Sequence, residues 1–362
     1  MSMDLSRKAF LRTTSVALAA GLAGCSSPDD AGPSTERSDA TSPTLGQFYV
    51  GDPDAGDVID GRAQVVAVEP SGGSDKPPVV MVPGLGLSPY IYLTTPDGRP
   101  GWVEQFVAAG HPVYVFNPPR NVDSGGLDTE ALRNADSASL SRWSLDRAWP
   151  TWGFGPAVGE RYADVRYPLD AVDQLVASFP AYVSSGGGGQ QGRTSRRSAN
   201  ASESTPSGPD AEPTQTGGGS WFASPRETAA LEALLGRVGP AVLLVHSAAG
   251  GSGFAVAQSV PELVDRIVAV EPVGCPTDPD TVSAMGGDAP FMGVYGDYVD
   301  ERGQASRAAA CRTTADLASE TNDASTMLDL PAEGITGNTH LLMQDDNNSD
   351  IADRIISWIG AQ

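Results

Sequence analysis

The chain has 362 residues, of which 40% are hydrophobic, and a formal net charge of −22 at pH 7. This length and composition predict a globular protein with a large core, in one big domain or two small ones. The negative charge argues against a nucleic-acid partner, because a phosphate backbone is bound by a basic surface. Lys8 and Lys76 are the only lysines. An acid-rich, lysine-poor surface is typical of halophilic prokaryotes, with an ordinary acidic exported protein as the alternative.

The N-terminal residues 1–25 have the layout of an export signal. A basic start, Ser6-Arg-Lys-Ala-Phe-Leu-Arg12, precedes an apolar run at 14–22 that is too short to span a bilayer. The start resembles a twin-arginine signal with Lys8 in place of the second arginine. The end, Leu22-Ala-Gly-Cys25, resembles a lipobox, which implies cleavage before Cys25 and a lipid on its sulfur; plain secretion without Cys25 is the alternative. We therefore expect an exported protein, extracellular or on the cell surface, that meets the membrane only through this anchor.

The remaining cysteines form an even pair. If Cys25 carries lipid, Cys275 and Cys311 are left together in an oxidising compartment, which predicts a disulfide between them. Two free, buried thiols are the alternative.

After a Ser/Thr/Pro/Asp-rich tether at 26–45, strand and helix signals alternate. Alternation of this kind predicts an α/β fold with a mostly parallel sheet and helices on both of its faces. The short apolar runs suit strands that are buried on both faces. The expected strands are 63–68, 79–82, 113–116, 241–245, 267–270, 291–295 and 326–330, and the expected helices are 102–109, 224–238 and 349–359.

One long region interrupts this alternation. Residues 126–183 are rich in aromatics, including Trp143, Trp149, Trp152 and Phe154, and predict a cap inserted before the strand at 241–245. Residues 184–220 are a low-complexity stretch that cannot form a core and predict a disordered insertion. The predicted core therefore consists of two parts, 46–125 and 221–362.

Ser247 follows the strand at 241–245 and precedes small residues and a helix-like segment. This arrangement predicts a nucleophile elbow, a tight strand-to-helix turn that presents a serine hydroxyl to substrate. The common pattern is G-x-S-x-G, and here Val245 and Ala249 replace the two glycines. A serine in this position can also be a simple helix cap.

A nucleophilic serine needs a base, and the chain has three histidines. His246 is adjacent to Ser247 and should point away from it, and His111 precedes a strand at the opposite end of the sheet. His340 follows the last expected strand, where a loop returns over the carboxyl ends of the strands, and is the expected base. The order serine, acid, histidine is that of the α/β-hydrolases. Glu271 and Asp297 each follow a strand, and position alone does not separate them as the acid.

Several segments resemble a bacterial and archaeal secreted esterase family of the α/β-hydrolase fold. They are Thr95-Pro-Asp-Gly-Arg-Pro-Gly-Trp102, Thr151-Trp-Gly-Phe-Gly-Pro156, Val270-Glu-Pro272 and Gly337-Asn-Thr-His-Leu-Leu-Met-Gln-Asp345. The resemblance covers residues 46–362 apart from the low-complexity insertion. It implies that Glu271 is the acid, with Asp297 as the alternative.

The oxyanion hole is expected at two backbone N–H groups. One belongs to Ala248, the residue after the nucleophile. The resemblance places the other at Leu85, in the loop Pro83-Gly-Leu-Gly86, although Pro83 departs from the His-Gly common in hydrolases.

These residues together predict a serine carboxylesterase that acts on a small-molecule ester through an acyl-enzyme on Ser247, with His340 and Glu271. No cofactor is expected, and the scattered histidines predict no metal site. The alternatives are an inactive relative of this fold that binds an apolar ligand, or an acyltransferase that uses the same residues.

Overall fold

The computed structural model describes residues 42–51, 62–124, 138–185, 225–286 and 289–361. The predicted signal with Cys25, the tether up to residue 41 and nearly all of the predicted insertion lie outside these residues, so the statements about them stay predictions. The described residues from 43 onward belong to one compact unit, and the contacts below lie within it.

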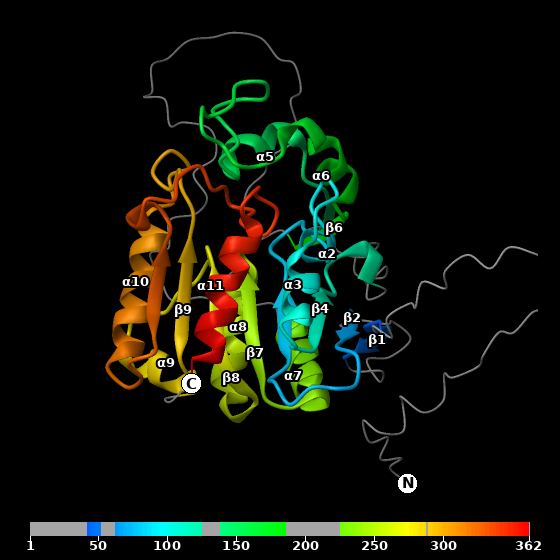
Figure 1. Ribbon diagram of the computed structural model, residues 1–362, viewed down its shortest axis with the longest axis vertical. Helices are drawn as coiled ribbons and strands as arrows, with labels where there is room; N and C mark the ends of the chain where they lie inside the picture. Colours follow the sequence, from blue (N-terminus) through cyan, green and yellow to red (C-terminus); the bar gives the residue numbers. More distant parts are fainter. Residues whose placement is uncertain (1–41, 52–61, 125–137, 186–224, 287–288, 362) are drawn as a thin grey trace, which may run out of the picture. The chain divides into compact units, whose positions relative to one another are not determined.

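The apolar runs form an eight-stranded sheet (Figure 1). All seven expected strands are present, and β1 adds an edge strand that the sequence analysis did not expect; its first two residues fall in the predicted tether and the rest in the predicted core. Only β1–β2 and β2–β4 pair antiparallel, and the other pairs are parallel, as expected. In their order across the sheet the strands are β1 (Thr44–Val50), β2 (Ala63–Glu69), β4 (Val113–Asn117), β3 (Val79–Val82), β7 (Ala241–His246), β8 (Val264–Val270), β9 (Phe291–Tyr295) and β10 (Thr326–Asp329).

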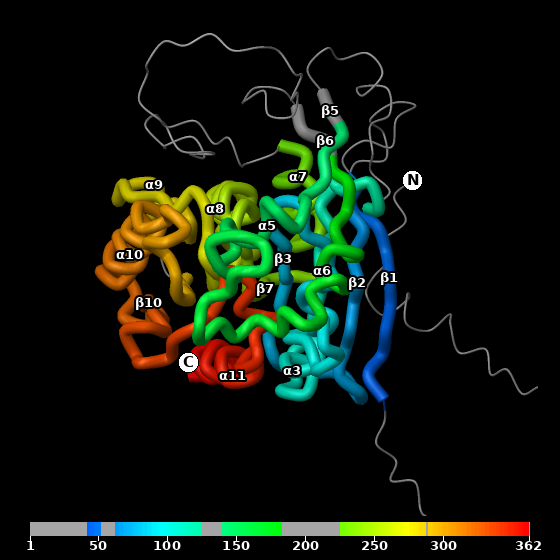
Figure 2. The backbone as a smooth tube through the Cα atoms, turned by 90° about the horizontal axis from the view of Figure 1, so that it is seen from above, coloured from blue at the N-terminus to red at the C-terminus, as the bar shows by residue number. Residues whose placement is uncertain are grey.

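Helices cover both faces of the sheet because alternate residues of each strand point to opposite sides. Val79 and Met81 of β3 join one core cluster, while Val80 and Val82 join the other. Figure 2 shows α3 and α11 on one side of the strands and α7, α8 and α9 on the other. The helices are α2 (Tyr90–Leu93), α3 (Trp102–Ala108), α7 (Pro225–Val238), α8 (Ala249–Ser259), α9 (Pro279–Ala284), α10 (Ala305–Ser319) and α11 (Asn348–Gly360).

The described part of the predicted cap, residues 138–183, follows β4 in the chain and contains a two-stranded sheet and two short helices. Its aromatic side chains pack on one another: Trp152 and Phe179 lie 5.4 Å apart between ring centroids, and Phe154 and Tyr167 lie 4.4 Å apart. These rings are buried and belong to the same core cluster as α3 and α11, so they serve packing. The elements are β5 (Ala138–Ser141), α5 (Leu145–Thr151), α6 (Val172–Ser178) and β6 (Tyr182–Ser185).

The expected disulfide is wrong for this structure, because Cys275 and Cys311 are both free thiols. Cys311 faces inward from α10 and accepts or donates a hydrogen bond with Cys275, and this contact together with burial raises the pKa of the Cys311 thiol. The two sulfurs therefore pack as small, weakly polar groups inside the layer between α10 and the sheet.

Candidate active site

Ser247 lies on a sharp turn between β7 and α8. Its backbone has φ 54°, a left-handed conformation that non-glycine residues rarely adopt. The turn is fixed from β8, since Ser247 N donates to Val270 O at 3.0 Å and Val273 N donates to Ser247 O at 2.9 Å. The strand–turn–helix geometry predicted for a nucleophile elbow is present. Within the described residues the half-buried Ser247 hydroxyl makes no hydrogen bond, and such contacts are often long until substrate binds.

The two departures from the G-x-S-x-G pattern are accommodated by other glycines. Val245 points toward α8, where a Cβ on Gly253 would lie 2.5 Å from Val245 Cγ1. A Cβ on Gly250 would lie 2.4 Å from Val273 O, while Ala249 is fully buried. The positions that must lack a side chain are therefore Gly250 and Gly253, which lie one and four residues after Ala249.

Glu271 and His340 form a short contact, with Glu271 Oε2 lying 2.5 Å from His340 Nδ1. Glu271 directly follows β8 and also has a left-handed backbone, φ 42°. Its carboxylate accepts a hydrogen bond from Gly296 N at 3.0 Å and two from Arg302 at 2.7 and 2.9 Å. Glu271 is therefore the acid that reaches the expected base, and Arg302 is a partner that the sequence analysis missed.

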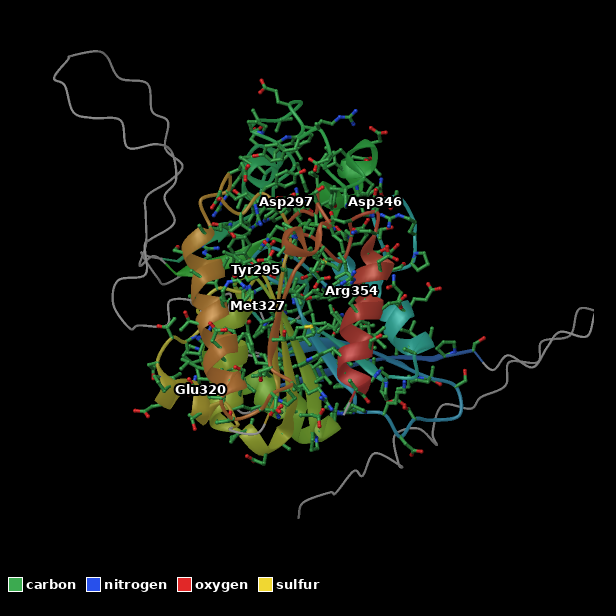
Figure 3. All side chains as sticks on the ribbon, turned by 60° about the vertical axis from the view of Figure 1, so that its left-hand side comes forward. Tyr295, Asp297, Glu320, Met327, Asp346 and Arg354 are labelled. Atoms are coloured by element: carbon green, nitrogen blue, oxygen red, sulfur yellow. The ribbon has the colours of Figure 1, made fainter. Side chains whose placement is uncertain are left out.

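Asp297, the alternative acid, has another role. Its carboxylate accepts from Gly337 N at 3.0 Å and from Tyr298 N at 2.8 Å, and Asp297 N donates to Asn338 O at 2.8 Å. Asp297 thus binds backbone groups of the loop that carries His340. It lies just beyond β9, at the same end of the sheet as Asp346 and opposite Glu320 (Figure 3).

The buried charges give this pair a defined protonation state. Burial raises the pKa of Glu271, but Arg302 and the bond to His340 outweigh it and bring the pKa down to about 2. Burial has the largest effect on His340 and lowers its pKa. The hydrogen bond to Glu271 and the negative charge of Glu271 raise this pKa, and the positive charges of Arg302 and Arg307 lower it, so that the net change is a decrease. Near neutral pH the acid is therefore ionised and the imidazole is neutral and able to take up a proton.

His246 lies against His340, with ring centroids 4.5 Å apart. Its Nε2 is 2.9 Å from His340 O, so Nε2 carries the proton and donates to this carbonyl. Burial lowers the pKa of His246 well below its usual value, and the nearby His340 lowers it further. The His246 ring is therefore neutral. His246 thus bonds to the backbone of His340 and helps to fix the histidine loop. His111 is a buried structural residue bonded to Pro77 O.

The loop at 83–86 lies directly against the elbow. A Cβ on Gly84 would be 2.7 Å from Ser247 Cβ, a separation that only glycine permits. Among the described residues, the N–H groups of Leu85 and Ala248 donate to no other group. The loop is also contacted by the half-buried Arg120, which donates to Pro83 O at 3.5 Å and forms an ion pair with the buried Glu227. The two expected oxyanion donors are thus unpaired. Ala248 follows Ser247 in the chain, and Leu85 follows Gly84, which lies against Ser247.

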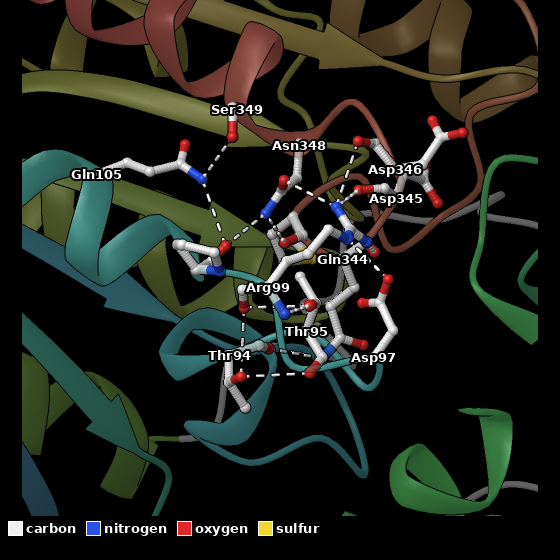
Figure 4. Close-up of polar contacts among 12 residues, drawn as sticks. Thr94, Thr95, Asp97, Arg99, Gln105, Gln344, Asp345, Asp346, Asn348 and Ser349 are labelled. Atoms are coloured by element: carbon white, nitrogen blue, oxygen red, sulfur yellow. Dashed lines mark hydrogen bonds and ion pairs between the residues drawn. The ribbon is translucent and has the colours of Figure 1, made fainter.

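The two long segments that carry the family resemblance are in contact (Figure 4). Arg99 donates to the carbonyls of Gln344, Asp345 and Asp346 at 2.9–3.2 Å, and Trp102 Nε1 donates to Asn348 O at 3.0 Å. The arginine therefore satisfies three carbonyl acceptors in the loop after His340. Two motifs about 240 residues apart form one support for the histidine loop.

Asp345 bonds back onto the same loop. Its buried carboxylate accepts from Asn338 Nδ2 at 2.9 Å, from Thr339 N at 2.8 Å and from Thr339 Oγ1 at 2.8 Å. Burial raises the pKa of Asp345 to about 7 despite these donors, which lower it. The residues on either side of His340 are in this way tied to one another.

The cap segment also holds the histidine loop. His340 N donates to Trp152 O at 2.9 Å, and Arg166 N donates to Gly337 O at 2.8 Å. A Cβ on Gly337 would lie 1.9 Å from Asp164 O, so this glycine allows the two backbones to meet. In Figure 1, α5 and α6 lie beyond the end of the strands where these loops are.

The described residues contain no group of three or more His, Cys, Asp or Glu side chains placed to hold a metal ion. None of the helices among these residues is long and apolar enough to cross a membrane.

Comparisons with known proteins bear on the fold and the class of activity. No protein-family model matches the chain. Among curated proteins it is similar to one named probable secreted lipase phiG, from a fungal species (strain ATCC 74256), with 25% identity over 386 residues that cover 90% of this chain and 92% of that protein. Among solved structures it is similar to one described as a novel bacterial esterase, with 26% identity, a TM-score of 0.68, and coverage of 88% of this chain and 95% of that one. The fold is that of the α/β-hydrolases, as expected, and the similarities support an esterase family within it.

Proposed function

We propose that this chain is an exported serine carboxylesterase, with Ser247 as nucleophile, His340 as base and Glu271 as the acid that orients the base. The observation that carries the proposal is the 2.5 Å contact between Glu271 and His340 Nδ1, because it leaves His340 Nε2 as the ring atom able to accept a proton. The left-handed turn at Ser247 and the similarity to a secreted lipase and a bacterial esterase support the same conclusion.

The reaction has two halves. Ser247 Oγ attacks the ester carbonyl carbon while its proton passes to His340 Nε2, and the N–H groups of Leu85 and Ala248 bind the oxyanion. Collapse breaks the ester C–O bond, and the alcohol leaves with the proton from His340. Water then attacks the acyl-enzyme, with its proton taken by His340, and the carboxylic acid is released as Ser247 regains its proton.

A labelling experiment tests the nucleophile. A fluorophosphonate probe should modify Ser247 and abolish hydrolysis of short p-nitrophenyl esters, while Ser247→Ala should neither react nor turn over. Folded wild-type protein that neither reacts nor hydrolyses these esters would refute the proposal and favour a ligand-binding relative of the fold. Product formation only when an alcohol acceptor is added would indicate acyl transfer.

Export and lipid attachment are a separate part of the proposal. The similarity to a protein named as secreted supports export. Mass spectrometry of the N-terminal peptide of the mature protein tests the anchor: a diacylglyceryl group on Cys25 is expected, and an unmodified terminus elsewhere would refute it.

A further inference from the structure

Arg302 forms hydrogen bonds to both oxygens of the Glu271 carboxylate. Its Nη1 donates to Oε2 at 2.7 Å and its Nη2 donates to Oε1 at 2.9 Å, and neither side chain is exposed to solvent. This is the two-pronged arginine–carboxylate arrangement, which fixes the plane of the carboxylate as well as its charge. Oε2 is shared between Arg302 and His340, so the cation acts on the same oxygen that orients the base.

Arg302 is itself held in place. Its Nε donates to Tyr298 O at 3.3 Å and its Nη2 donates to Asp297 O at 3.1 Å, so the turn after β9 fixes the guanidinium. From the cap, Gly153 packs close enough that a Cβ there would lie 3.2 Å from Arg302 Cδ. A side chain bound on three sides has no freedom to leave the carboxylate.

A fully buried carboxylate without a cation would tend to keep its proton, because desolvation disfavours the charged form. A protonated Glu271 could no longer accept from His340 Nδ1 as an anion, and the ring would lose the partner that selects its tautomer. Some group must therefore keep Glu271 ionised, and the geometry assigns that task to Arg302.

We propose that Arg302 is a positioning residue of the active site, which keeps Glu271 ionised and oriented and so sets the lower pH limit at which His340 works as a base. This inference rests on the proposed function. Arg302 acts through Glu271 and does not need to touch the substrate.

The charges that face His340 come from several elements. Glu271 after β8 is in direct contact, His246 of β7 lies against the ring and is neutral, and Arg302 and Arg307 supply positive charge from the turn after β9 and from α10. The neighbouring carboxylates Asp297 and Asp345 are engaged by donors of the loops around His340. Arg302 is thus the cation that is bonded to the acid itself.

The acid limb of the pH profile of kcat/KM separates this role from simple core packing. Arg302→Gln retains N–H donors but removes the charge. The acid limb should then shift to higher pH by about 1 to 2 units, because His340 and Glu271 both bind protons more readily without the cation. Arg302→Lys retains the charge and should leave the limb near its wild-type position. Arg312→Gln, which removes an exposed arginine paired with Asp329, is the matched control and should not move the limb.

A nuclear magnetic resonance titration of the His340 ring gives a readout that does not require turnover, and only three histidines need assignment. The Gln variant should show His340 titrating at higher pH than the wild type and the Lys variant. A folded Gln variant in which neither the limb nor the titration moves would overturn the inference. Wild-type protein that lacks esterase activity would refute the proposed function, while the titration would still decide the role of Arg302.

If Arg302→Gln is too unstable to assay, its melting temperature provides a second test. Removing the arginine leaves Glu271 buried and unpaired, so Arg302→Gln combined with Glu271→Gln should melt at a higher temperature than Arg302→Gln alone. A double variant no more stable than the single one would show that Arg302 does not act through Glu271, and would overturn the inference.

Discussion

The three non-glycine residues with left-handed backbone in the described chain are Ser247, Glu271 and Tyr298. They follow β7, β8 and β9 in turn, so the strain lies along one edge of the sheet, where the candidate site is. Each such residue costs on the order of 1–3 kcal/mol and persists only if its surroundings hold it. The bonds of Ser247 to β8 and of Glu271 N to Val294 O provide that support.

At the same scale, the choice between the two acids can be tested by paired amide substitutions. Glu271→Gln keeps the size of the side chain but removes the charge that orients and stabilises a protonated His340, and we expect kcat to fall by about 10³- to 10⁴-fold. Asp297→Asn retains one acceptor for the histidine loop, and we expect a loss below about tenfold, as for a loop support that touches no reacting atom. Steady-state kinetics on one ester checks both variants. The reverse ranking would identify Asp297 as the acid.

At the scale of elements, the site depends on how closely two turns approach each other. The loop after β3 contacts the elbow after β7 through Gly84 and Ser247, and the parallel pairing of β3 with β7 brings both turns to the carboxyl ends of neighbouring strands. The third turn, after β8, brings Glu271 alongside. The close approach of these backbones therefore determines where the two proposed oxyanion donors lie.

Gly84→Ala tests this approach. The new Cβ would meet Ser247 Cβ at 2.7 Å and His246 Nδ1 at 3.1 Å, so the loop must move outward and carry Leu85 N–H with it. Loss of one oxyanion donor lowers kcat by about 10²- to 10³-fold, and we expect a decrease of that order with a smaller change in KM.

Gly236→Ala is the matched control for that substitution. Gly236 lies within α7, and nothing is within 4 Å of its Cβ position. Alanine there should leave kcat unchanged and raise the free energy of unfolding by about 0.5–1 kcal/mol, as measured by denaturant titration. Equal kinetic losses in the two variants would show that the close contact at Gly84 has no special role.

At the scale of the whole molecule, the balance of charge is uneven. The chain has 45 acidic residues and 23 basic ones, so about half of the carboxylates cannot pair with a cation. Several of the ion pairs that do form are exposed, such as Arg354 with Glu333 and Arg312 with Asp329, and exposed pairs contribute little to stability. Repulsion among the remaining carboxylates therefore opposes folding at low ionic strength.

Salt should relieve that repulsion. At about 1 M salt the Debye length is roughly 3 Å, compared with about 10 Å at 0.1 M. We expect the melting temperature and the esterase activity to rise between about 0.1 M and 2 M KCl at neutral pH. Potassium chloride is suitable because sulfate would also strengthen apolar burial.

The same titration at a pH near the isoelectric point of about 4.3 is an internal control, since the net charge there is close to zero and the effect of salt should shrink. A melting temperature that stays constant with KCl at neutral pH would mean that the acidic surface serves solubility alone, and would contradict the prediction of a halophilic protein.

The sequence by itself determined the strands of the parallel sheet, because runs such as Ala241–Val245 are apolar on both faces and end at turn residues. It also located the elbow at Ser247 and the loop of His340, since both follow such strands. The helix α10 was missed because its buried residues are small or polar, Cys311, Thr314, Ala315 and Ala318, and give no apolar stripe. The start of α8 was missed for a similar reason, because its glycines favour no helix in isolation.

The tertiary structure alone decided what depends on contacts between distant residues. From position in the chain, Glu271 and Asp297 were equivalent, and only the packing of β8 and β9 beside the histidine loop gives Glu271 the contact with His340 and Asp297 the loop backbone. Arg302 had no signal in the sequence, because a single arginine in a turn is ordinary until a buried carboxylate lies 2.7 Å away. Sequence records local preference and strand burial, whereas the partners of a buried charge are set by which loops the sheet order brings together.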